Sequence, residues 1–108
     1  FKGDWTTITS TSPYIDEIVV PFTTCVAKNL IYGTSSAYGG GTTSTVTLLK
    51  NGVATALTAT LTDPALMVYN LADDVALVAG DRLMMSHSFT GAGFGSRGHH
   101  CQITLEST

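Results

Sequence analysis

The segment from Thr45 to Thr62, TVTLLKNGVATALTATLT, constrains the fold of this chain more than any other. Two β-prone runs flank Asn51-Gly52, a dipeptide that favours the type I′ turn because both central positions of that turn need positive φ. In the second run apolar residues and threonines alternate, which gives a strand one dry face and one wet face. The segment therefore predicts an antiparallel hairpin packed on a core. The residues assigned to the core are Leu57, Ala59 and Leu61, and those assigned to the outside are Thr58, Thr60 and Thr62.

Alternation predicts three further strands. Ile18 to Phe22 contains Pro21, which places this strand at an edge or near its end because proline donates no ladder hydrogen bond. Arg82 to Thr90 has the longest regular alternation, and His99 to Glu106 is the last strand. The side chains predicted to share the inward faces of the last two strands are Leu83, Met85, His87 and Phe89, and Cys101, Ile103 and Leu105. We interpret His87 as a core or interface histidine satisfied by a hydrogen bond.

The strand predicted over Cys25 to Tyr32 has two candidate inward faces. In the first, Lys28 lies outside and extends its ammonium group into water. In the second, Asn29 is buried and needs a hydrogen-bond partner. We favour the first. The first face consists of Val26, Leu30 and Tyr32, and the second of Cys25, Ala27 and Ile31.

The segment Asp63 to Ala79 allows a helix or two strands. Asp63-Pro64 is typical of a helix start, and several apolar residues follow at helical spacing. Asp74 falls on that apolar stripe, however, and counts against the helix. We predict two short strands, Leu66 to Tyr69 and Val75 to Val78, joined by a turn.

The chain has 108 residues, which indicates one domain. We predict an all-β fold, a single antiparallel β-sandwich or jelly roll of about eight strands over residues 15–108. Residues 1–14 are predicted to be an N-terminal arm or linker, in which Thr6 to Thr11 forms an edge strand or an arm held by Trp5. The chain begins with Phe1 and not Met, as expected of a processed product or a piece of a longer protein.

The composition favours association with other protein surfaces. Only 12% of the residues are charged, against roughly 25% in ordinary soluble domains. A Thr-rich, charge-poor surface resists association weakly, so we expect a homo-oligomer, either a trimer or a dimer. The five basic residues are scattered, so nucleic acid is not expected as a partner. No apolar run approaches the roughly 20 residues of a membrane span, so membrane insertion is not expected.

No arrangement of residues specific to catalysis or cofactor binding is present. Paired acid/base groups and the G-x-S-x-G motif are missing, so we expect no enzyme activity. His99 and His100 are consecutive on a strand and point to opposite faces, so one chain cannot direct both at a metal ion. We expect no metal and no cofactor. Cys25 and Cys101 form either a disulfide or two buried thiols.

The candidate binding residues are carried by glycine-rich segments. Tyr38 follows Gly33, Phe94 and Arg97 lie within GAGFGSRG, and His99 comes directly after it. Aromatic and Arg side chains on loops at the end of a sandwich often contact sugars or protein partners. The alternative is that Phe94 packs over the core and Arg97 is solvated.

Several stretches together resemble a known family. They are IVVPF at Ile18 to Phe22, VTLLKNGV at Val46 to Val53, VALVAGDRLMM at Val75 to Met85, and the terminal QITLE. The chain resembles the small jelly-roll modules of bacteriophage virion proteins, which are similar to TNF/C1q-like β-sandwiches.

This resemblance implies a non-enzymatic protein at the surface of the phage particle, acting as a capsid decoration protein or a tail-fibre head. The partners that it implies are further copies of the chain, the major capsid protein or the fibre shaft, and a host-surface glycan. A carbohydrate-binding module of a larger secreted protein is the alternative.

Overall fold

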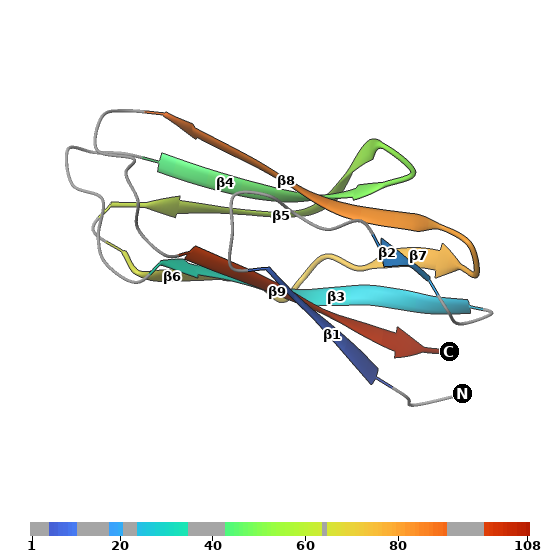
Figure 1. Ribbon diagram of the computed structural model, residues 1–108. Coiled ribbons are helices and arrows are strands. Elements are labelled where there is room, and N and C mark those ends of the chain that lie inside the picture. The colour runs from blue at the N-terminus through green and yellow to red at the C-terminus, as the bar shows by residue number, and fades with distance from the viewer. Residues whose placement is uncertain (1–4, 11–17, 21–23, 35–42, 64, 91–98) are drawn as a thin grey trace.

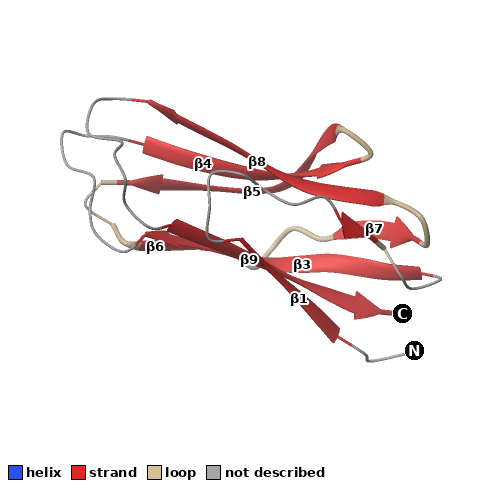
Figure 2. Cartoon of the chain, viewed as in Figure 1, coloured by secondary structure: helices blue, strands red, loops and turns tan. Residues whose placement is uncertain are grey.

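The computed structural model describes residues 5–10, 18–20, 24–34, 43–63, 65–90 and 99–108, and these form an all-β sandwich (Figure 1). Strands and loops make up the whole of this part of the chain, without a helix (Figure 2). Accordingly, no described segment is a helix long and apolar enough to cross a membrane. The strands are β1 (Trp5–Ser10), β2 (Ile18–Val19), β3 (Thr24–Thr34), β4 (Thr43–Lys50), β5 (Val53–Thr62), β6 (Met67–Asn70), β7 (Val75–Val78), β8 (Arg82–Thr90) and β9 (His99–Ser107).

The strands pair in the nested order of a jelly roll. One sheet has the order β1-β9-β3-β6, with β7 also paired to β3, and the other has the order β2-β8-β4-β5. Every pair is antiparallel, and early strands pair with late ones: β1 with β9, β2 with β8, β3 with β6 and β7, and β4 with β5. Because β6 and β7 lie end to end along β3, they act as one interrupted strand. The predicted sandwich of about eight strands is confirmed.

The core lies between the two sheets and contains the inward side chains of both. The predicted alternation of β5 is confirmed, since its three assigned apolar residues are buried and its three assigned threonines are exposed. In β8 and β9 the residues predicted to point inward, where their side chains are described, are buried, except that His87 is half-buried. The large side chains less than 2% exposed include Tyr32, Leu30, Leu48, Leu57, Leu61, Leu83, Ile103 and Leu105.

A β-bulge in β3 explains why its inward face was ambiguous in the sequence. The register against β9 shifts between Lys28 and Ile31, and Asn29 has a φ of 55°. The extra residue changes which side chains point inward. Cys25 and Ala27 are buried before the bulge, and Leu30 and Tyr32 are buried after it. Each predicted face is therefore right on one side of the bulge and wrong on the other: Val26 and Ile31 are only half-buried.

The segment after Asp63 forms the two predicted strands, and the helical alternative is wrong. β6 and β7 are separated by Leu71–Asp74, which lies opposite the bulge of β3. The side chain of Asn70 organises this break: its Oδ1 accepts the N–H groups of Ala72 and Asp73 at 3.2 and 3.1 Å. Its Nδ2 donates to the carbonyl oxygen of Thr58 at 2.9 Å and so connects the edges of the two sheets.

The N-terminal segment Trp5–Ser10 is the edge strand of the two alternatives. It pairs with β9 along its whole length, from Trp5 opposite Glu106 to Ser10 opposite Cys101. The predicted boundary between residues 14 and 15 lies outside the described residues, as does Pro21.

Cys25 and Cys101 are free and buried, so the disulfide considered from the sequence is not formed. In the pairing of β3 with β9, Cys25 is opposite Ser107 and Cys101 is opposite Tyr32. At about 3.4 Å per residue, this offset separates the two cysteines by about 20 Å along the sheet. A disulfide needs Cα atoms within about 7 Å. Burial, and to a lesser degree the charge of Asp81, raises the pKa of the Cys25 thiol, which favours an unreactive cysteine.

Candidate functional site

Four strands end or begin together at one end of the sandwich, where the candidate binding segments are attached. Thr34, the last residue of β3, is opposite His99, the first of β9. Thr43, the first residue of β4, is opposite Thr90, the last of β8. Figure 1 shows these four termini at the same end. The connections 35–42 and 91–98 therefore leave the sandwich from neighbouring points, and we call this region the loop-bearing end.

Of the predicted binding residues, only His99 lies within the described part of the chain. Its backbone begins β9, and nothing is described of its side chain. Tyr38, Phe94 and Arg97 lie outside the described residues. The structure brings together the strand termini to which the segments with these residues are attached. The sequence did not predict this arrangement of the termini.

Directly beneath the loop-bearing end, three polar side chains meet inside the sandwich. Tyr32 from β3, Ser44 from β4 and His87 from β8 form what we call the polar triad. The Tyr32 hydroxyl lies 2.6 Å from Ser44 Oγ and 3.3 Å from His87 Nε2, and Ser44 Oγ lies 2.6 Å from His87 Nε2. Because β3 belongs to one sheet and β4 and β8 to the other, the triad connects the two sheets through hydrogen bonds.

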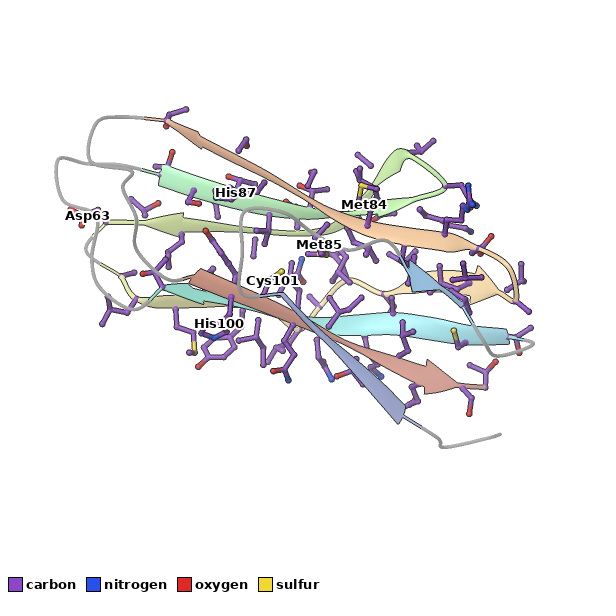
Figure 3. The ribbon with its side chains drawn as sticks, viewed as in Figure 1. Asp63, Met84, Met85, His87, His100 and Cys101 are labelled. Carbon is purple, nitrogen blue, oxygen red and sulfur yellow. The ribbon has the colours of Figure 1, made fainter. Side chains whose placement is uncertain are left out.

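The triad results from alternation in three strands. His87 lies on the inward face of β8 with Leu83 and Met85, and its predicted hydrogen-bond satisfaction is confirmed (Figure 3). Tyr32 points inward only because of the bulge, and Ser44 precedes the segment from which the hairpin was predicted. Tyr32 and Ser44 were therefore missed as interacting residues.

The Ser44–His87 contact has the length of a nucleophile–base hydrogen bond, but its position argues against that role. Ser44 is 0% exposed and Tyr32 1% exposed, so the hydroxyl lies between the sheets, where a substrate does not reach it. The geometry supports a positioning role, in which the triad fixes the strands that carry the loop-bearing end. In the described ranges, no group of three or more His, Cys, Asp or Glu side chains is placed to hold a metal ion.

At the opposite end, the Asn51-Gly52 turn is tied to the turn between β7 and β8. The φ values of Asn51 and Gly52 are 53° and 83°, which confirms the two-residue turn with positive φ at both positions. Asn51 Nδ2 donates to Asp81 Oδ1 at 3.0 Å, and the N–H of Arg82 donates to Asn51 Oδ1 at 2.9 Å. The backbone N–H of Asn51 also donates to the carbonyl oxygen of Arg82 at 2.8 Å.

Asp81 is the centre of this second cluster. Its Oδ2 accepts the backbone N–H of Val78 at 2.9 Å and lies 3.8 Å from Lys50 Nζ. The hydrogen bond from Val78, then that from Asn51, and the nearby charge of Lys50 lower the pKa of Asp81 against the opposing effect of burial. Asp81 thus holds the backbone of the turn between β7 and β8. We call Lys50, Asn51 and Asp81 the hairpin clamp.

Comparison with known proteins finds remote similarity to solved structures. No family model and no curated protein sequence matches the chain. Among solved structures, the tripod of the bacteriophage Tuc2009 baseplate is similar, with a TM-score of 0.43, 13% identity and coverage of 96% of this chain and 64% of that one. A Paenibacillus sp. cycloisomaltooligosaccharide glucanotransferase complexed with cycloisomaltoheptaose is also similar. Its TM-score is 0.40 and its identity 16%, and the match covers 97% of this chain and 18% of that one. The chain thus spans less than two thirds of either protein, and neither likeness bears on what it does.

Proposed function

We propose that this chain is a non-enzymatic structural module of a bacteriophage particle, exposed at its surface as a capsid decoration protein or a tail-fibre head. One observation carries the proposal. The NGV and GDRL stretches, which carry the resemblance to phage jelly-roll modules, form a single structural unit. Asn51 of the first donates to Asp81 of the second at 3.0 Å, and the N–H of Arg82 donates back to Asn51.

The distribution of polar groups supports a structural role over a catalytic one. In the polar triad the Ser44 hydroxyl is fully buried and contacts a half-buried His87, and the ionised Asp81 is engaged in turn contacts. Both clusters hold strands of the frame together, and the triad does so at the loop-bearing end. A sandwich held together in this way suits a module that binds the capsid or fibre shaft through its body and a host-surface glycan through the segments at its loop-bearing end.

The test is a binding measurement with two targets. The purified chain is mixed with capsids that lack decoration and, separately, with host cells, and bound protein is measured after sedimentation. Capsid binding supports decoration, and host-cell binding supports a fibre head. Binding to neither target overturns the proposal. Binding to soluble polysaccharide alone also overturns it and favours the carbohydrate-binding module.

A pair of variants locates the binding surface. Phe94→Ala with Arg97→Ala removes the candidate loop side chains, and Thr60→Lys changes the outer face of β5. A fibre head loses host-cell binding in the first variant and keeps it in the second. A decoration protein keeps capsid binding in the first variant.

A further inference from the structure

The outer faces of the two sheets differ in chemistry. On the four-stranded sheet, threonine hydroxyls pair across strands: Thr45 with Thr60 and Thr47 with Thr58, each at 2.9 Å. The part of this face covered by hydroxyls is compatible with water, although strands of the same sheet also expose Val19, Val53 and Met84 at 56%, 67% and 38%. Along the β6–β7 margin of the five-stranded sheet the exposed side chains are instead apolar. Met67 is 44% exposed, Tyr69 56% and Val78 53%.

The strand register extends this apolar margin onto the sheet. Ile31 is opposite both Tyr69 and Gln102, and Gly33 is opposite both Met67 and His100. Directly opposite residues place their side chains on the same face. A Cβ atom at Gly33 would lie 3.1 Å from His100 Cε1, so the imidazole packs against the Gly33 backbone. Figure 3 shows His100 on the outer side of the sheet. We call Ile31, Met67, Tyr69 and His100 the outer patch.

The same face carries one base and one acid next to the patch. Lys28 and Glu106 lie on neighbouring strands with Nζ and Oε1 3.9 Å apart, and their side chains are 30% and 33% exposed. The pair is only partly desolvated, so both groups are available to a second partner. A face that carries adjacent charges of opposite sign can be complementary to itself, because a two-fold axis that passes between the charges places each over its opposite.

We propose that two copies of the chain associate through the outer face of the five-stranded sheet, with outer patch against outer patch and Lys28 of each copy facing Glu106 of the other. The balanced charges favour a second copy over an acidic or basic partner. The Ile31 and Met67 side chains favour protein over sugar, which is recognised by rows of aromatic rings and polar groups. This inference goes beyond the proposed function: it gives a surface and a symmetry to the homo-oligomer expected from the composition.

Sedimentation equilibrium measures the association. The wild-type chain forms a dimer. Tyr69→Lys raises the Kd of the dimer by about 30-fold, as expected for loss of a central aromatic contact. Thr60→Lys, on the other sheet, places the same charge on an exposed strand and leaves Kd unchanged. Circular dichroism confirms that both variants fold. A wild-type monomer, a trimer, or equal effects of the two variants overturns the proposal.

A charge exchange tests the symmetry. Lys28→Glu and Glu106→Lys each place like charges together and weaken self-association, whereas an equimolar mixture of the two variants forms a heterodimer at least as tight as the wild-type dimer. Failure of the mixture to restore association overturns the two-fold arrangement. Particle binding by the wild-type chain is measured separately. A monomer that binds particles removes this inference alone, and a dimer that binds neither capsids nor cells removes the proposed function alone.

Discussion

Two consecutive residues of β4 make similar hydrogen bonds in opposite surroundings. Ser44 points into the sandwich and lies 2.6 Å from both the Tyr32 hydroxyl and His87 Nε2. Thr45 points outward and pairs with Thr60 at 2.9 Å. Water can replace the partner of an outer hydroxyl. It cannot reach Ser44, which is 0% exposed, so leaving this hydroxyl unpaired lowers the free energy of unfolding by about 1–3 kcal/mol. Location, more than hydrogen-bond length, decides how much each contact stabilises the fold.

The hairpin clamp lies between these extremes. Its hydrogen bonds are partly buried, and it includes an ionised group. The stabilisation of the fold by the clamp therefore depends on pH. The contacts between neutral hydroxyls on the outer face have no such pH dependence. The clamp and the polar triad fix opposite ends of the sandwich by different chemistry.

The largest expected effect is at Tyr32. Tyr32→Ala removes a fully buried ring and one member of the polar triad, and we expect the free energy of unfolding to fall by about 3–5 kcal/mol. Urea titration followed by circular dichroism measures the change. The matched control is Val53→Ala, at a 67% exposed position outside the proposed dimer surface, which should change stability by less than about 0.5 kcal/mol.

Tyr32→Phe isolates the hydroxyl from the ring. It should destabilise the protein by about 1–2 kcal/mol, because the hydroxyl's hydrogen bonds to Ser44 and His87 are lost inside the core. A variant as stable as the wild type would show that the interior contact is worth no more than the outer one. That result would break the comparison between Ser44 and Thr45.

Asn51→Ala should destabilise by about 2–3 kcal/mol. Two side-chain hydrogen bonds of about 1 kcal/mol each are lost, and alanine at a φ of 53° adds about 1 kcal/mol of backbone strain. Asn51→Gly is the control, because glycine adopts this φ freely and removes only the side-chain bonds. Equal stability of Asn51→Gly and wild type in thermal unfolding would exclude a contribution from the clamp.

Asp81→Asn should have a smaller effect that depends on pH, because asparagine keeps an acceptor for the N–H of Val78. The folded state lowers the pKa of Asp81, so its carboxylate stabilises the fold above the unfolded pKa of about 3.9. This contribution is lost as the pH falls through the folded pKa. The difference in free energy of unfolding between wild type and Asp81→Asn should be largest near neutral pH and should shrink in acid. A constant difference between pH 2 and 7 would contradict this pH dependence.

Features set by neighbouring residues were predictable from the sequence, and features set by distant contacts were not. The Asn51-Gly52 turn and the faces of β5 follow from local φ preferences and alternation. The bulge at Asn29 does not, because it depends on how β3 meets β9 and the β6–β7 break. Without the bulge, alternation alone cannot turn both Ala27 and Tyr32 inward.

The candidate site divides in the same way. Satisfaction of His87 by a hydrogen bond was predictable from its place on an apolar face. Its partners were not, since Tyr32 and Ser44 lie 55 and 43 residues away in the sequence and meet it only when the two sheets stack. The predicted loop residues Tyr38, Phe94 and Arg97 remain predictions that the binding experiment tests.

The smallest effect is expected on the hydroxyl-covered face. Thr58→Lys and Thr60→Lys replace exposed side chains of β5 that pair with Thr47 and Thr45, and each should change stability by less than about 0.5 kcal/mol in urea titration. A larger loss would mean that outer hydroxyl pairs stabilise the fold as inner ones do. If stability is unchanged but particle binding disappears, the threonine face is an interface and not a solvated surface. Water would then contact these hydroxyls only before assembly. Ser44 would stabilise the fold, whereas the face that carries Thr45 would serve assembly.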